Sequence, residues 1–211
     1  MLARLLCTGI VLLFSSFVSH ATIIEVSQGG NVLGTIRAFN GTESALQNWN
    51  RNANPNIGPG GIARASQLFF YSNPIDGVTF NFLSDRANSN SSGGLSLLAT
   101  VDSTGDPFAL YGDDGFHEFY ETTNNDVFKG NWNWISCCTD GGIIGGLNGK
   151  WSIDVEITRI TNVNQFLIQG LDNTIVYDQS QSVSFRNVST PASITLVIFA
   201  LGLLAYKGLK R

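Results

Sequence analysis

The stretch WSIDVEIT, residues 151–158, alternates between apolar and polar side chains over four full periods. A period of two places successive side chains on opposite faces of an extended strand. The apolar residues from Trp151 to Ile157 are therefore predicted to face a core, and the polar residues from Ser152 to Thr158 to face water. The stretch predicts a half-buried β-strand.

Shorter segments extend this pattern along the chain. β-branched and aromatic residues between turn residues predict further strands at 23–27, 32–38, 67–72, 78–82, 95–101, 108–111, 118–122, 166–169, 174–177 and 182–186. The predicted turns are Gly29-Gly30, Asp76-Gly77, 92–94, Asn148-Gly149 and Asp172-Asn173. One short helix is predicted around residues 43–49, next to a surface loop at 48–61. Together these elements predict an all-β domain at 22–188, an antiparallel β-sandwich of jelly-roll-like type.

The charge balance limits the partners of the chain. Four of the 12 Lys and Arg residues and none of the 16 Asp and Glu residues lie outside residues 22–188, so this segment carries a net charge of −8. A nucleic-acid partner is therefore not expected. Charged residues make up 13% of the chain, about half the usual share, while Asn and Gly reach 20 and 23 residues. Such a surface is typical of extracellular β-proteins with many turns.

The first 21 residues have the pattern of a signal peptide. Arg4 precedes an apolar stretch at residues 5–18, and Ser19 and Ala21 are small residues of the kind that a signal peptidase accepts. Cleavage is predicted between Ala21 and Thr22. An uncleaved amphipathic helix is the alternative.

The end of the chain carries a second apolar segment. Residues 192–206 form an uncharged run of fifteen residues, and Lys207, Lys210 and Arg211 follow it. The run is short against the ~20 residues that a bilayer span usually needs, yet it has no polar face, so we predict a transmembrane helix at 192–206. The basic cluster is predicted to stay on the cytoplasmic side, where positive charges are enriched.

The motif Ser189-Thr190-Pro191, the apolar run and the terminal basic cluster together resemble the PEP-CTERM sorting tail. The Pro-Glu-Pro of that family is replaced here, with only its last proline, Pro191, retained. The resemblance implies an exported protein of a Gram-negative bacterium, anchored in the inner membrane by its tail until an exosortase-type membrane protease processes it. It also implies a final place at the cell surface or in the extracellular matrix, beside exopolysaccharide.

Cys137 and Cys138 are the only cysteines that remain once Cys7 leaves with the signal peptide. Free thiols rarely persist in an oxidising compartment, so we predict a disulfide between the two neighbours, although ordinary bridges prefer Cα atoms ~4.4 Å or more apart. Intermolecular bridging and reduced thiols are the alternatives. Residues 137–142 are similar to segments of PEP-CTERM proteins, which implies a structural turn. A nucleophilic cysteine with His117 as its base has no supporting spacing.

Four aspartates lie among Gly, Ser and Thr residues in predicted loops: Asp102, Asp106, Asp113 and Asp114. Carboxylate oxygens are the hard ligands that calcium prefers, so these residues form a candidate calcium site. The alternative is ordinary turn chemistry, in which Asp side chains bond the nearby backbone. No other cofactor is expected.

Trp132 and Trp134 lie on the same side of an extended segment, with asparagines between them. If that side is exposed, the indole rings could stack on a sugar while the amides bind its hydroxyl groups. The alternative is that both rings fill the core, because tryptophan is highly buried on average.

No residue is predicted to be catalytic. A glycosidase would need two carboxylates across a cleft, and carboxyl groups are present at Glu118, Glu121, Asp154 and Glu156. Asp154 and Glu156, however, fall on the predicted solvent-facing side of the strand at 151–158. The sequence therefore predicts a non-enzymatic structural or adhesive protein of the envelope or matrix. A carbohydrate-binding or carbohydrate-active protein that acts on exopolysaccharide is the alternative.

Overall fold

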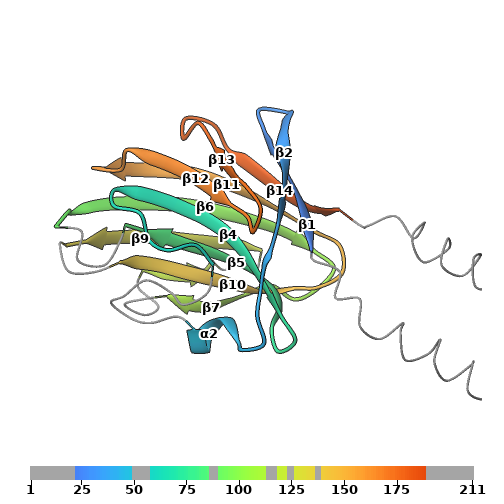
Figure 1. The fold of residues 1–211 in the computed structure, drawn as a ribbon. Coiled ribbons are helices and arrows are strands. Elements are labelled where there is room, and N and C mark those ends of the chain that lie inside the picture. Colours follow the sequence, from blue (N-terminus) through green and yellow to red (C-terminus); the bar gives the residue numbers. More distant parts are fainter. Residues whose placement is uncertain are drawn as a thin grey trace, which may run out of the picture.

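The computed structural model of the chain describes residues 22–48, 58–85, 90–112, 118–122, 126–135 and 139–188. Over these residues the protein is all-β, with two sheets packed face to face in a sandwich-like arrangement (Figure 1). The all-β prediction is thus confirmed. Every strand predicted from the sequence is present, and the predicted helix corresponds to α2 (Ala45–Asn48).

Two sheets contain the strands. In spatial order, sheet A consists of β2 (Asn31–Arg37), β1 (Ile23–Gln28), β14 (Val183–Val188), β11 (Trp151–Thr161), β6 (Gly93–Ser103), β9 (Val127–Trp134) and β8 (Phe119–Glu121). Sheet B consists of β13 (Thr174–Val176), β12 (Gln165–Gln169), β4 (Ala65–Asn73), β5 (Gly77–Ser84), β10 (Asp140–Leu147) and β7 (Phe108–Gly112), with β3 (Phe39–Asn40) beside β4.

Most strand pairs are antiparallel, as predicted, but two pairs are parallel. β12 and β3 both run parallel to β4. The chain leaves β11 in sheet A and enters β12 in sheet B, so β12 is not the second strand of a hairpin. It can therefore lie beside β4 in either direction, which hairpin patterns in the sequence do not determine.

The main core lies between the sheets, and β11 shows why it forms there. Trp151, Ile153 and Val155 are buried, whereas Asp154 and Glu156 are exposed, which confirms the alternation. Aromatic rings from both sheets fill the centre. The Trp151 ring stacks on Phe70 of sheet B with centroids 5.2 Å apart. Burial of large rings in this layer is the main stabilising term of the fold.

A smaller apolar cluster covers the outer face of sheet B. Phe69 and Tyr71 of β4 pack there with Ala45 of α2. The Tyr71 hydroxyl donates a hydrogen bond to the Glu43 carbonyl oxygen (2.9 Å), and Phe39 meets the Phe69 ring edge to face at 6.1 Å. β4 is therefore buried on both faces, which explains its long run of aromatic residues.

Strand β10 is a glycine-rich segment whose sequence resembles a turn although it forms a strand. Its sequence DGGIIGGL suggests a turn, yet all eight residues are buried in sheet B. At Gly142 an added Cβ would lie 2.9 Å from the Phe119 ring, so only glycine lets the sheets approach there. Gly146 has φ +77° and lies at a register shift opposite β5, where glycine is the natural residue. Gly93 and Gly94, predicted as a turn, likewise belong to β6.

The edges of the two sheets meet at β2 and the β12–β13 hairpin. The Asn173 side-chain amide donates to the Thr35 carbonyl oxygen (2.9 Å), and Arg37 Nε lies 2.9 Å from Asp172 Oδ2. Partial desolvation opposes ionisation of Asp172, but hydrogen bonds from Arg37 hold its pKa below the ordinary value. This carboxylate therefore stabilises the edge above the pKa of an unfolded aspartate and loses that effect as the pH falls through its lowered pKa.

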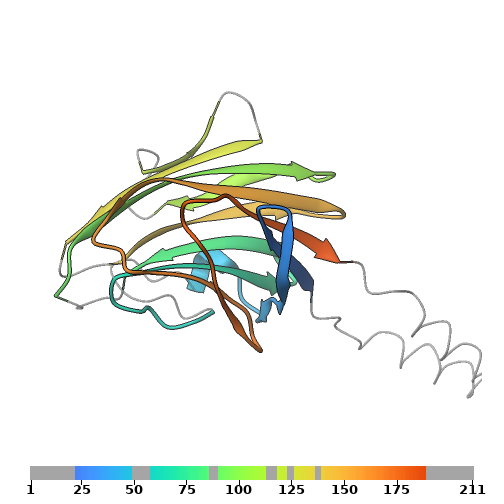
Figure 2. The same cartoon turned by 90° about the horizontal axis from the view of Figure 1, so that it is seen from above.

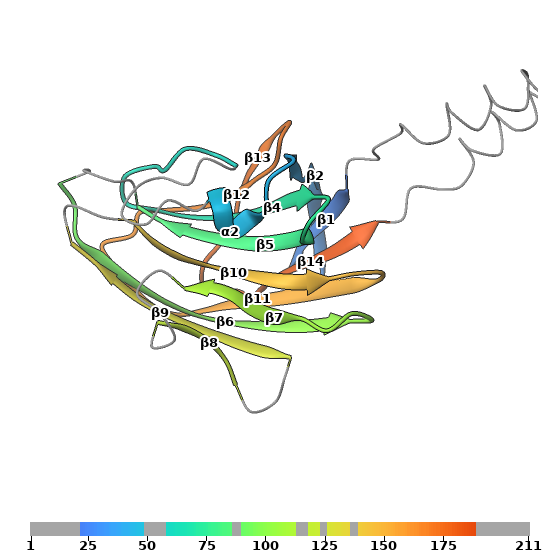
Figure 3. The same ribbon diagram turned by 90° about the horizontal axis from the view of Figure 1, so that it is seen from below.

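The first and last described strands pair with each other. β1 and β14 are antiparallel, and Ile23 pairs with Val188 (Figure 2). The turns 74–76, 103–107 and 148–150 lie on the same side of the molecule as this pair (Figure 3). We call this side the terminus end, and define it as the three turns together with Ile23, Phe108 and Val188.

The predicted signal peptide (1–21) and the predicted transmembrane helix (192–206) lie outside the described residues. In the part of the chain that the structure describes, no helix is both long and apolar enough to cross a bilayer.

The Gln28 side chain fixes the loop that leads into β14. Its amide nitrogen donates to the carbonyl oxygens of Asp178 (2.7 Å) and Gln181 (3.2 Å), and its oxygen accepts from the Asp178 N–H (3.0 Å). We expect Gln28→Ala to lower the free energy of unfolding by about 1–3 kcal/mol, because these bonds are lost in a largely buried site. Chemical denaturation measures the change. Gln165→Ala, at an exposed strand position, is the control and should change stability little. Equal effects of the two substitutions would contradict the role of Gln28 in fixing this loop.

Candidate functional site

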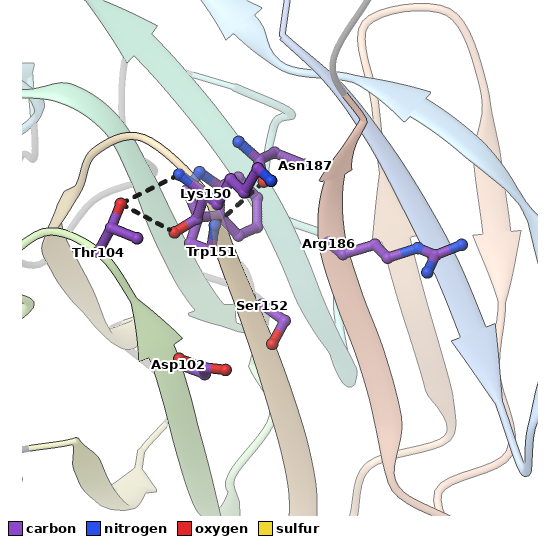
Figure 4. A pocket seen from close by; sticks show the side chains of 7 residues that line it. All are labelled: Asp102, Thr104, Lys150, Trp151, Ser152, Arg186 and Asn187. Atoms are coloured by element: carbon purple, nitrogen blue, oxygen red, sulfur yellow. Dashed lines mark hydrogen bonds between the residues drawn. The ribbon is translucent and has the colours of Figure 1, made fainter.

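A groove of about 450 Å³ lies on the outer face of sheet A, beside the terminus end (Figure 4). Seven residues from three neighbouring strands and two turns line it: Asp102, Thr104, Lys150, Trp151, Ser152, Arg186 and Asn187. It is open to solvent and mixes both signs of charge with hydroxyl and amide groups.

Strand register brings the charged residues of the groove together. Ser152 of β11 pairs with Asp102 of β6 on one side and with Arg186 of β14 on the other. Side chains at paired positions share a face of the sheet, so these three lie next to one another on the solvent side. The residues are far apart in the sequence, and only the order β14-β11-β6 makes them neighbours.

Hydrogen bonds fix the turn at one end of the groove. The Lys150 N–H donates to the Thr104 hydroxyl oxygen (3.2 Å), and the Thr104 N–H donates to the Lys150 carbonyl oxygen (3.0 Å). Asn187 accepts from the Trp151 N–H (3.1 Å) and donates to the Gly149 carbonyl oxygen (2.6 Å). The backbone is therefore held on both sides, and the Lys150 side chain extends from a preformed turn.

The charges of the groove differ in their partners. Arg186 Nη2 lies 2.7 Å from Glu25 Oε1 of β1, so this guanidinium is already neutralised in part, and Figure 4 shows its side chain directed away from Asp102. Lys150 is exposed, and within the described residues no carboxylate lies within ion-pair distance of it. Lys150 is thus available to an anionic or polyhydroxylated ligand, with Asp102 and Ser152 as nearby hydrogen-bond acceptors.

Both predicted sugar-stacking residues are in the core. Trp132 and Trp134 are 0% and 2% exposed. The Trp132 ring stacks on Phe119 with centroids 5.9 Å apart and also packs against Phe82 of sheet B. Rings with so little exposed surface offer no face to a saccharide, so the structure corrects the sugar-contact assignment in favour of packing. The extended segment that holds them is strand β9.

The candidate calcium residues are not brought together where the structure describes them. Asp102 lines the groove, and Asp106 lies exposed in the turn 103–107. Asp113 and Asp114 lie outside the described residues. Among the described residues, no three acidic, histidine or cysteine side chains cluster as a metal site would require.

Cys137 and Cys138 also lie outside the described residues, so their pairing stays a prediction. They directly precede Thr139, and the buried strand β10 begins at Asp140. Two of the carboxylates considered for a glycosidase, Asp154 and Glu156, lie on the outer face of β11. Asp154 accepts a hydrogen bond from Ser184, and Glu156 is exposed.

Sequence reasoning missed Lys150, Arg186 and Asn187 as members of one site. Lys150 was visible only as the residue after the predicted Asn148-Gly149 turn, and the strand at 182–186 carried no motif. Their proximity depends on the register of three strands, which the sequence pattern does not contain.

Comparisons of this chain with protein-family models, with curated protein sequences and with solved structures gave no match.

Replacement of Trp132 tests whether β9 tryptophans pack or bind. We expect Trp132→Ala to lower the free energy of unfolding by about 3–5 kcal/mol, because it removes a large ring from the core. Denaturant unfolding measures it, and Lys129→Ala, at an exposed position of the same strand, is the control. If Trp132→Ala left stability intact but abolished binding to a polysaccharide, the packing assignment would be wrong.

Proposed function

We propose that this protein is an exported component of the bacterial cell envelope or extracellular matrix, with a structural or adhesive role rather than a catalytic one. In this proposal a signal peptide at 1–21 directs export, and a tail at 189–211 holds the protein in the inner membrane until an exosortase-type protease processes it. A jelly-roll-like sandwich and a transmembrane helix at 192–206 are part of the same proposal.

The observation that supports it best is the pairing of Ile23 with Val188. The two apolar segments of the sequence flank the domain, and this pairing makes both of them leave it from adjacent strands at one end. A membrane attachment through either segment would then present the same side of the domain to the bilayer. The rest of the domain would project outward, which suits a surface or matrix component.

The outer face of sheet A gives the proposed adhesive surface. Ser152, Asp154 and Ser184 are partly or fully exposed there, and the groove adds Lys150 and Asp102. Hydroxyl and carboxylate groups together with the Lys150 ammonium can form many weak hydrogen bonds with a hydrated polymer. Such contacts support adhesion without requiring a reacting group.

Removal of the tail by a protease tests the proposal. We expect the chain to end near residues 188–191 in cells that contain a matching exosortase, and to keep residues 192–211 in the membrane fraction where the protease is absent. The mass of the C-terminal peptide measures this. Proline disfavours helical geometry at the residue before it, so Pro191→Ala is expected to slow processing, with Pro107→Ala as a control outside the tail.

Full-length chain ending at Arg211 in equal amounts in both kinds of cell would contradict the role of the protease. The tail would then be an anchor alone.

A second candidate function is binding of an acidic polysaccharide in the groove. The ammonium of Lys150, which has no ion-pair partner among the described residues, favours it. Uronate carboxylates would pair with Lys150, while Ser152 and Asn187 contact sugar hydroxyls. Because Asp102 lies in the same groove, binding would be moderate and would weaken with added salt. A binding role of this kind is compatible with an adhesive matrix protein.

Affinity electrophoresis of the full chain in gels containing alginate tests this candidate. We expect Lys150→Ala to weaken retardation about tenfold, which corresponds to one charge-assisted hydrogen bond of roughly 1.4 kcal/mol. Lys150→Arg should keep most of the effect, and Lys129→Ala, which removes a charge elsewhere on sheet A, should have little effect. Equal loss with Lys129→Ala would mean that only net charge matters and that the groove is not the site.

A further inference from the structure

The terminus end carries apolar side chains that face solvent. Ile75 is 63% exposed at the tip of the turn 74–76, Phe108 is 45% exposed at the start of β7, and Val188 is 38% exposed at the end of β14. Turn tips normally carry polar residues or glycine. Figure 3 shows the connections β4–β5, β6–β7 and β10–β11 on the side where β14 ends, so the three residues share one end of the domain.

The turn that carries Ile75 is tightly built. The Asn73 side-chain oxygen accepts hydrogen bonds from the N–H groups of Ile75 (2.8 Å) and Asp76 (2.7 Å). Asp76 Oδ2 in turn accepts from the Asn73 side-chain amide (3.1 Å) and from the N–H of Ala45 (2.6 Å), the first residue of α2. The isoleucine is therefore held outward by its own turn and by α2.

Contacts between the turns make the terminus end one continuous surface. Thr104 of the turn 103–107 is bonded to Lys150, and Asn187 next to Val188 is bonded to Gly149. Gly77, at the end of the turn 74–76, approaches the Asn148 side chain. The turns are thus held to one another, and Lys150 is exposed among them.

The length of chain beyond Val188 indicates what this surface meets. Only three residues, 189–191, separate Val188 from the apolar run that begins at Ala192. Four Cα–Cα steps span at most about 14 Å. If the run enters a bilayer, the terminus end is therefore confined to the immediate neighbourhood of the lipid headgroups, whose layer is several ångströms thick.

We propose that the terminus end is a docking surface for the lipid bilayer, in which Ile75, Phe108 and Val188 enter the interfacial layer. The contact is mainly apolar, because the same end also carries carboxylates: Asp106 lies in the turn 103–107, and Asp102 lines the groove with Lys150. The inference rests on the proposed membrane attachment of the tail. It goes further in assigning a fixed orientation to the domain and a role to three exposed residues that the core does not explain.

Site-specific photo-cross-linking of the full chain tests this proposal. Purified protein is reconstituted in vesicles of phosphatidylethanolamine and phosphatidylglycerol, with p-benzoylphenylalanine in place of Ile75 or Phe108. Ile135 supplies the control: it is 66% exposed, and it follows Trp134, which pairs with Gly93 at the opposite end of β6 from Ser103. Thermal unfolding is measured for each variant, so that only folded proteins are compared.

We expect severalfold more lipid adduct from positions 75 and 108 than from position 135. Flotation of the vesicles is measured in parallel. If the full chain does not float with them, the proposed function and this inference fail together. If it floats but positions 75 and 135 give equal adducts, only the inference fails. Protein–protein adducts at position 75 in place of lipid adducts would also overturn it, because they would show that a second copy covers the surface.

Discussion

The packing of β11 against sheet B holds the two layers together and also decides what the outer surface displays. Trp151 stacks on Phe70, and Ile153 continues the buried row behind it. Because side chains alternate along a strand, burial of this row forces Ser152 outward, between Asp102 and Arg186. A slip of one residue would exchange the two sets. The core and the groove therefore depend on one register, and neither can change without the other.

A strand was predictable from the sequence where one of its faces is buried and the other is exposed to solvent. β11 is read correctly because Asp154 and Glu156 interrupt its apolar residues. β10 is buried on both faces and has glycines where the neighbouring rings need space, so its sequence has no period of two and suggests a turn. The parallel partner of β12 was not predictable either, because pairing between distant segments depends on how the chain crosses from one sheet to the other.

The candidate site was less predictable than the fold, for a related reason. Asp102 was identified for its carboxylate, but its neighbours Lys150 and Asn187 have no motif that connects them with it. Trp132 and Trp134 illustrate the opposite difficulty, since alternation shows that two rings share a face without showing which face is buried. Here Trp132 packs against Phe119 of the neighbouring strand and against Phe82 of the facing sheet, which places the rings inside the sandwich.

The pairing of β1 with β14 also has a consequence for the order of folding. These strands lie at opposite ends of the domain sequence. The hairpin β1–β2 can therefore join the rest of sheet A only after β14, the last strand of the domain, is available for pairing. Until then β1 and β11 each have an unpaired edge that can recruit a strand from another chain. Closing so long a segment is slow compared with forming the β4–β5 hairpin. Aggregation during this interval, more than weakness of the finished core, is the main hazard for such a topology.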